Sequence, residues 1–267
     1  MPLCDVYVLA LKPPCSVSAF LQSLKVNDIK PIIQARVVRW VILPTQLSTD
    51  PLLAHNIHWD LLLILPGQTK LPGDTQSRVA ASWTVTAGVP SRLIKDFAQK
   101  NEKLLNPPPG SVKPPEVGEV LTARSAKNLE LSPELQDWID HLPEGTRRHP
   151  VSMLNLLSFN PNQKQNYLKY GAAFAERIGS KHGGDAKIVG NVVSGQGKEE
   201  GWDEIAVAHY PSLRHFAAML GSIDYQEVNK RYRVGSLRDT CILCTMEITD
   251  DGELAGIRGE VSDEAKL

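Results

Sequence analysis

Two polar side chains interrupt strand-like apolar segments, and both are of types that can do chemistry. Asn155 lies inside the apolar run 153–157, where a buried amide is costly unless it is hydrogen-bonded. His209 shares one face of a second run with Ile205 and Val207, and an imidazole can act as a general base near neutral pH. We therefore expect His209 to abstract a proton while Asn155 holds the developing oxyanion. The alternative is structural: Asn155 bonds a neighbouring strand or loop, and His209 bonds backbone or water.

Four further side chains are candidates for ligand contacts: His58, Tyr170, Trp202 and Tyr225. The two tyrosine hydroxyls can reach a pocket, although both tyrosines also fall on apolar helical stripes that are typical of a core. His58 is either an N-terminal counterpart of the base or a residue at the rim where a strand starts.

The dipeptide Trp-Asp occurs twice, each time before an apolar strand. Trp202-Asp203 precedes the run 205–208, and Trp59-Asp60 precedes the run 61–65. A structural role is the economical interpretation, with the indole covering the end of a sheet and the carboxylate capping a loop. The repeat therefore indicates two related halves and lies outside the predicted active site.

The sequence offers no template for a metal or a nucleotide cofactor. It contains no G-x-S-x-G, G-x-G-x-x-G, P-loop or H-E-x-x-H motif, and His55 and His58 have no companion ligand at a suitable spacing. Cys241 and Cys244 fall three apart in a strand, so they point to opposite faces and read as buried, reduced thiols. We expect neither a metal nor a cofactor.

The C-terminal half has the clearest element order. Strands are predicted over 153–159, 186–194, 202–210 and 237–248, with the middle pair antiparallel around the turn 195–197. One helix follows Pro161 and another begins at Pro211. The order strand, helix, strand, strand, helix, strand predicts an α+β fold of the ferredoxin-like kind.

The N-terminal half predicts strands over 5–11, 32–43, 59–65 and 79–86, a helix capped by Ser16, and a helix over 91–105. Proline-rich segments around 107–115 mark a linker, followed by a strap helix that Ser132 caps. We therefore expect an N-terminal domain over 1–105, a linker and strap over 106–150, a C-terminal domain over 151–249 and a disordered acidic tail over 250–267.

Size and composition limit the classes of partner. A chain of 267 residues is natural for two domains, and a formal charge of −1 leaves no field to attract nucleic acid. No apolar run is long enough to cross a membrane, and the first residues lack the features of a secretory signal. We expect a cytoplasmic protein that binds neither nucleic acid nor membrane.

The C-terminal half resembles the dimeric α/β-barrel superfamily, in a branch without an assigned activity. The resemblance rests on the segment 151–159, on 167–171, on Trp202-Asp203-Glu204, on 210–212 and on Tyr225 and Arg238. It implies two antiparallel ferredoxin-like sheets packed into a barrel, with a ligand held between sheet and helices. The N-terminal half resembles a diverged second copy of fungal type, so an internal pseudo-dimer is expected, either monomeric or as a homodimer.

Two functions follow from this resemblance. The first is a cofactor-independent enzyme, an isomerase, cyclase or monooxygenase, acting on a small apolar or aromatic molecule. The second is a non-catalytic protein that uses the barrel for ligand binding or self-association. An enclosed cavity lined by Asn155 and His209 would favour the enzyme, and a barrel filled by its own side chains would favour the alternative.

Overall fold

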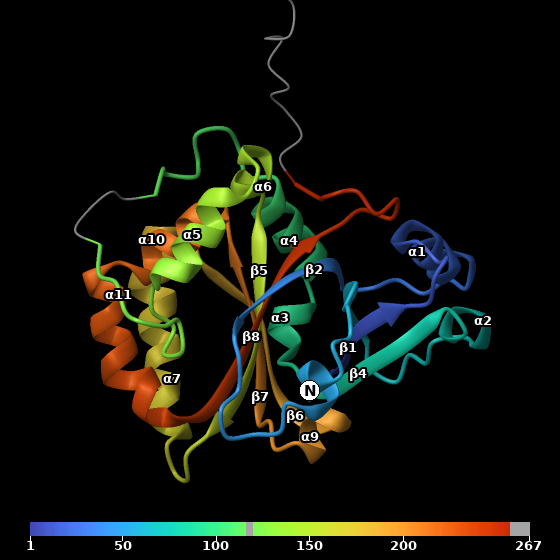
Figure 1. The fold of residues 1–267 in the computed structure, drawn as a ribbon, viewed down its shortest axis with the longest axis horizontal. Coiled ribbons are helices and arrows are strands. Elements are labelled where there is room, and N and C mark those ends of the chain that lie inside the picture. Colours follow the sequence, from blue (N-terminus) through green and yellow to red (C-terminus); the bar gives the residue numbers. More distant parts are fainter. Residues whose placement is uncertain (116–119, 257–267) are drawn as a thin grey trace, which may run out of the picture.

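Eight antiparallel strands form one closed barrel in the computed structural model, which describes residues 1–115 and 120–256 (Figure 1). Around the barrel the order is β1-β3-β2-β8-β5-β7-β6-β4. The strands are β1 (Leu3–Leu11), β2 (Ile33–Ile42), β3 (Leu61–Pro66), β4 (Val79–Gly88), β5 (Val151–Phe159), β6 (Asp185–Ser194), β7 (Glu204–Tyr210) and β8 (Leu237–Glu247). The predicted α+β class with antiparallel strands is confirmed.

Helices lie between and after the strands. The longer ones are α1 (Val17–Val26), α4 (Phe97–Leu105), α5 (Pro133–His141), α7 (Lys164–Ala173), α10 (Leu213–Leu220) and α11 (Ile223–Val228). Short α-helical turns are α2 (Gly73–Gln76), α3 (Ser91–Ile94), α6 (Glu144–Arg148), α8 (Gly179–His182) and α9 (Gln196–Glu199). Wider or tighter turns are η1 (Asp50–Ala54), η2 (Phe174–Ile178), η3 (Asn229–Arg233) and η4 (Val234–Ser236).

Both halves of the chain contribute to the barrel and to its interior. The N-terminal strands follow the order β4-β1-β3-β2 and the C-terminal strands the order β8-β5-β7-β6, and the pairs β2 with β8 and β4 with β6 close the ring. The barrel interior is filled by buried side chains from both halves, among them Trp59, Trp83, Trp202, Leu154 and Leu243. A single continuous core therefore joins the two halves.

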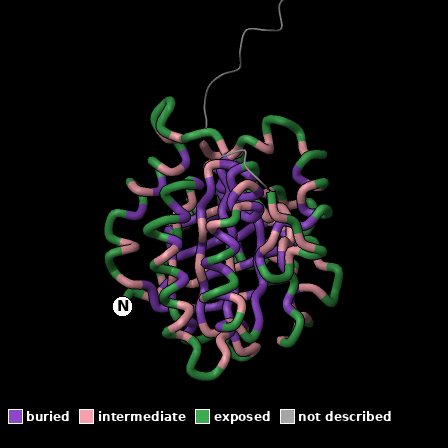
Figure 2. The backbone as a smooth tube through the Cα atoms, turned by 90° about the vertical axis from the view of Figure 1, so that its left-hand side faces the viewer, coloured by how far each residue is buried: buried purple, intermediate pink, exposed green. Residues whose placement is uncertain are grey.

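The outer faces of the two halves are covered unequally. In Figure 1 helices α5, α7, α10 and α11 stand on one side of the central strands, and α1 and α2 lie on the other side. Phe174 and Phe216 belong to the apolar layer over the C-terminal strands, whereas Phe20, Leu21 and Leu24 of α1 cover the N-terminal ones. Figure 2 shows the buried backbone in the middle of the molecule and the exposed backbone around it.

Helix starts follow the local sequence. The side chain of Ser16 accepts a hydrogen bond from Ala19 at the start of α1, and Ser132 accepts one from Leu135 at the start of α5. Both predicted caps are confirmed. Helix α5 lies against β2, where the guanidinium of Arg39 pairs with Glu134.

The helix predicted over 91–105 is broken into α3 and α4. Asp96, with φ −116° and ψ 27°, leaves the helical region between them. The break lets α4 turn across one end of the barrel, where Phe97 joins the interior core and Asn101 donates to Glu247 at 2.7 Å. Tertiary contacts at the barrel end therefore override the local helical periodicity.

Cys241 faces the barrel interior and Cys244 the outer layer, both buried and free, as predicted. Residues 250–256 of the predicted tail fold back, with the amide of Ala255 donating to the carbonyl of Glu247 at 2.8 Å. The remainder, 257–267, and residues 116–119 of the predicted linker lie outside the described residues. No helix among the described residues is long and apolar enough to cross a membrane.

Candidate functional site

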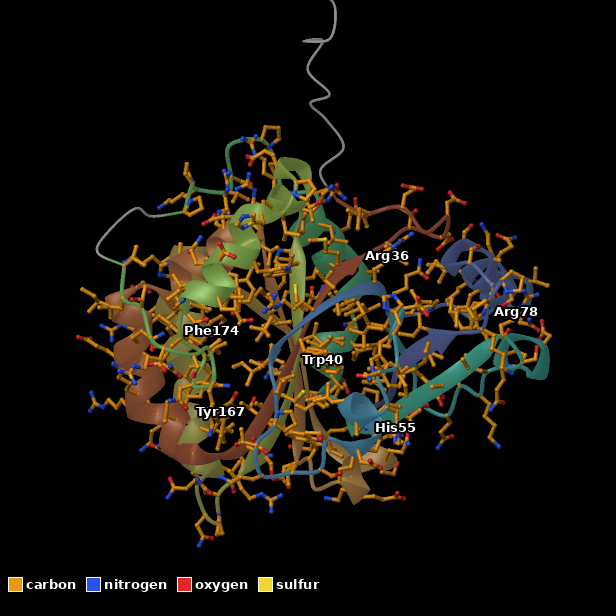
Figure 3. The ribbon with its side chains drawn as sticks, in the orientation of Figure 1. Arg36, Trp40, His55, Arg78, Tyr167 and Phe174 are labelled. Carbon is orange, nitrogen blue, oxygen red and sulfur yellow. The ribbon has the colours of Figure 1, made fainter. Side chains whose placement is uncertain are left out.

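A cavity of about 130 Å³ lies between the outer face of the C-terminal strands and helix α7. Strands β5 and β7 form its floor through Met153, Asn155, Ala206 and Ala208, and Tyr170 of α7 contributes to the opposite wall. Figure 3 shows Tyr167 and Phe174, two further lining residues, between the helices and the central strands. An engineered cavity of roughly 150 Å³ holds benzene, so this space accommodates a body of about one ring.

Small side chains create the space. Glu204, Ala206, Ala208 and Tyr210 alternate along β7 and all line the cavity, because alternate strand residues share one face. The two alanines leave room where larger residues would meet the helix, and Gly171 does the same on α7. The cavity therefore forms where small residues on one face of β7 lie opposite a glycine of α7.

The cavity reaches the surface between α7 and β6. Leu168 and Gly171 of α7 and Ala186 of β6 line it and are exposed. Its other end is closed by buried residues, including Tyr210, Phe216 and Ile242. A small molecule that entered beside Leu168 would lose its contact with solvent as it moved towards the buried end of the cavity.

Glu204 is the acidic group of the cavity. Its side chain is buried at the start of β7, and Oε2 lies 3.2 Å from Nζ of Lys164. Burial raises the pKa of this carboxyl, and the nearby Lys164 opposes that rise. A carboxyl with a raised pKa, at the edge of an apolar space, is suited to accept and return a proton.

Arg233 is a basic group of the cavity. It is 2% exposed, at the end of η3, and one Nη lies 3.4 Å from the hydroxyl of Thr240. The hydroxyl of Tyr167 also hydrogen-bonds to it. A guanidinium stays charged in proteins, so a full positive charge is present in this apolar region.

Asn155 offers the cavity an acceptor. Its Nδ2 donates to the backbone carbonyls of Met153 at 2.8 Å and Ala206 at 3.3 Å. Both amide hydrogens are therefore engaged, and Oδ1 is the atom left for a ligand. An acceptor oxygen cannot hold an oxyanion, so this geometry does not support the predicted role of Asn155. It leaves Asn155 as a hydrogen-bond acceptor for a ligand.

Tyrosine hydroxyls supply donors. The hydroxyls of Tyr170 and Tyr225 lie 3.2 Å apart, and burial raises the pKa of Tyr167, Tyr170, Tyr210 and Tyr225. All four therefore stay protonated at neutral pH and can donate. Tyr170 lines the cavity, whereas Tyr225 is not a lining residue and contacts the Tyr170 hydroxyl.

His209 lies on the opposite face of the sheet from Asn155. His209 shares its strand face with Ile205 and Val207, which pack inside the barrel, and it lies opposite Ser152 on strand β5. It is buried, and desolvation together with nearby Lys187 lowers its pKa to about 3. The structure therefore does not bring the two predicted catalytic residues together.

The remaining candidates lie apart from the cavity. The side chain of His58 is 92% exposed, with Nε2 3.6 Å from Oδ1 of Asp60. Trp202 is fully buried inside the barrel, where its indole and that of Trp83 both donate to the carboxylate of Glu200 at 3.1 Å and 2.9 Å. Both tryptophans thus anchor the α9 end of the barrel.

Sequence reasoning missed Glu204 and Arg233 as site residues. In the sequence, Glu204 stands out only as the third residue of the segment Trp202-Asp203-Glu204. It nevertheless shares with Ala206 and Ala208 the strand face opposite to that of Ile205. The periodicity of an apolar strand with one acidic member was the available signal. Arg233 has no such signal in the sequence, because its burial depends on how η3 packs against the tyrosines beside the cavity. Among the described residues, no cluster of His, Cys, Asp and Glu could hold a metal.

Comparisons with known proteins give fold-level likenesses of low sequence identity. No protein-family model and no curated protein matches the chain. A protein of unknown function from Rhodopseudomonas palustris aligns over 43% of this chain and 93% of its own length, with 22% identity and a TM-score of 0.35. Proteins described as "putative monooxygenase", from Lactobacillus acidophilus and Fusobacterium nucleatum, each align over 97% of this chain. They cover 99% and 98% of their own lengths, with 8% and 6% identity and TM-scores of 0.45 and 0.42.

Proposed function

We propose that the chain is an internally duplicated member of the dimeric α/β-barrel superfamily. Each half arranges its four strands in the same order. The pairing of β1 with β4 shifts register at Ala10/Leu11, and that of β5 with β8 shifts at Ser158/Phe159. Since the ring of strands closes within one chain, the proposed functional unit is a monomer. Light scattering tests this by measuring the molar mass in solution, which should equal the mass of one chain.

We propose that the cavity binds a small apolar molecule of about one ring and that Glu204 moves a proton on it. The observation that carries the proposal is the placement of a buried carboxyl with a raised pKa in a mainly apolar cavity that opens to solvent. Proton abstraction next to a carbonyl fits this arrangement, since no redox partner is required. Glu204 takes the proton from one carbon and returns it to another, so the substrate is isomerised or cyclised without net oxidation.

The predicted base, His209, does not fit this site as well as Glu204. It faces the barrel interior and is not among the residues that line the cavity between α7 and strands β5 and β7. Its role stays a prediction, and His209→Gln serves as the comparison variant below.

Deuterium exchange tests the proton transfer. The protein is incubated in heavy water with acetophenone and phenylpyruvate, one-ring compounds that carry exchangeable hydrogens beside a carbonyl. Mass spectrometry is expected to find faster deuterium incorporation with wild type than with Glu204→Gln, and an unchanged rate with His209→Gln. Equal rates for wild type and Glu204→Gln would remove the proposed base.

A second candidate is a non-catalytic ligand-binding protein. The observation favouring it is the barrel interior, which is filled by the chain's own side chains, including Trp59, Trp83 and Trp202. Native mass spectrometry that detects a bound one-ring molecule, together with no exchange above the rate in buffer, would favour this alternative.

A further inference from the structure

We propose that the ligand of this cavity carries a carboxylate that pairs with the guanidinium of Arg233. The inference rests on the proposed function and deepens it by naming the chemical class of the ligand: a one-ring or similarly sized carboxylic acid with an apolar body.

The charge of Arg233 has no counter-ion within the described part of the chain. Its side chain is 2% exposed, and no carboxylate of residues 1–115 and 120–256 forms an ion pair with it. Glu204, the acidic residue that lines the same cavity, is paired with Lys164 instead. A buried charge without a partner is costly, and a ligand that carries a carboxylate would remove that cost.

The hydrogen-bonding capacity of Arg233 is also only partly used. A guanidinium has five N–H donors in a planar fork. Thr240 accepts from Nη2 at a long 3.4 Å, and the hydroxyl of Tyr167 bonds to the same side chain. Donors are left over, and Arg233 lines this cavity as well as a second one that Asp239 and Thr240 border. A planar fork matches the two oxygens of a carboxylate.

The rest of the cavity suits the remainder of such a molecule. Ala206, Ala208, Met153 and Phe174 provide an apolar surface for a ring or short chain. Volume limits the ligand to about one ring plus its carboxylate. The free Oδ1 of Asn155 would accept a hydrogen bond from a hydroxyl or amine on that ring.

Matched probes separate the charge from the shape. Benzoate and benzamide have nearly the same size, and only benzoate is an anion. Isothermal titration calorimetry is expected to give a benzoate affinity at least about tenfold higher than that of benzamide, because a charge-assisted pair is stronger than a neutral one.

Two variants place that preference on one side chain. In Arg233→Met the benzoate affinity is expected to fall about tenfold or more, while benzamide binding stays within about twofold. Arg231→Met, which removes an exposed arginine two residues away, is the control and should leave both affinities unchanged. Arg233→Lys is measured as a second variant, and it should weaken benzoate because the planar fork is lost.

The thermal unfolding of the free protein provides a readout that needs no ligand. Arg233→Met is expected to unfold at the same or a higher temperature than wild type, because an unpaired buried charge is removed. A purely structural arginine would instead make the variant less stable.

The outcomes distinguish this inference from the proposed function. Equal binding of benzoate and benzamide to wild type, unchanged benzoate affinity in Arg233→Met, or a destabilised Arg233→Met would each overturn the carboxylate while leaving a ligand-binding cavity. If benzoate, benzamide and acetophenone all fail to bind wild type, the cavity is no ligand site, and the proposed function is overturned together with the inference.

Discussion

Asp60 and Asp203 make the same two backbone hydrogen bonds in the two halves of the barrel. The amide of Asp60 donates to Leu9 at 2.8 Å while its carboxylate accepts from Leu11 at 2.7 Å. The amide of Asp203 donates to Leu157 at 2.9 Å while its carboxylate accepts from Phe159 at 2.9 Å. Each aspartate thus holds the end of the first strand of its half, which explains why the Trp-Asp dipeptide recurs.

Replacing either aspartate by alanine should destabilise the barrel to a similar extent. Each substitution leaves a strand-end amide without its acceptor, which costs about 1–3 kcal/mol. Urea unfolding of Asp60→Ala and Asp203→Ala measures the loss. Asp60→Asn and Asp203→Asn keep an acceptor oxygen and are the controls. If only one of the two alanine variants lost stability, the two aspartates would not have equivalent roles.

His209 should make the protein sensitive to acid. Its pKa is lowered to about 3 from an ordinary 6.5, by desolvation first and then by Lys187, His215 and Lys100. Between these values the unfolded chain binds a proton that the folded chain does not, so stability falls as the pH drops from 6.5 towards 3. The shift corresponds to roughly 3–5 kcal/mol at the acid end.

The matched variants for this prediction are His209→Gln and His58→Gln. Unfolding free energies measured from pH 7 to pH 4 should fall less steeply in His209→Gln than in wild type, while exposed His58→Gln should follow wild type. Parallel curves for wild type and His209→Gln would show that His209 is not buried in an uncharged form.

The buried pair of Lys187 and Glu247 at the α4 end of the barrel should depend on both members. Lys187 is fully buried and pairs with Glu247, and Asn101 bonds to both side chains. Lys187→Met leaves a buried carboxylate unpaired, which costs about 3–5 kcal/mol. Adding Glu247→Leu should recover much of that loss. A double variant less stable than Lys187→Met would contradict this explanation.

Glu204 should give the proposed activity a characteristic pH profile. The base must be ionised to take a proton, and its pKa lies above the ordinary value of 4.5. The exchange rate should therefore rise with pH through that raised pKa. Stability has the opposite sign: the folded chain holds the proton more tightly, so the free energy of unfolding falls as the pH rises from 4.5 through the folded pKa.

Glu204→Gln separates these two effects. The variant should lose the pH-dependent rise in exchange rate and also the fall in stability over the same range. Lys164→Met, which removes the opposing cation, should move both transitions to higher pH. A profile that is the same in wild type and Glu204→Gln would assign the titration to another group.

The positions of the strands along the chain could be predicted from the sequence because their signals are local. The alternation of apolar residues in β5 to β8 and the caps at Ser16 and Ser132 depend only on neighbouring residues. The break at Asp96 could not be predicted, because it depends on contacts between α4 and the end of the barrel.

One residue that lines the cavity could be recognised from a local signal in the sequence. Asn155 is recognisable as a polar residue in an apolar strand, and it lines the cavity. Its assignment beside His209 required the register of β5 against β7, in which Asn155 faces Ala206 and His209 faces Ser152. Register places the two on opposite faces, and no local pattern contains it.

A crystal structure with 4-bromobenzoate tests most directly whether the cavity beside α7 is the ligand site. We expect the anomalous signal of bromine between α7 and strands β5 and β7, with the carboxylate on Arg233 and the ring against Ala206 and Ala208. Crystals soaked at saturating concentration that show an empty cavity, or bromine only elsewhere, would contradict it.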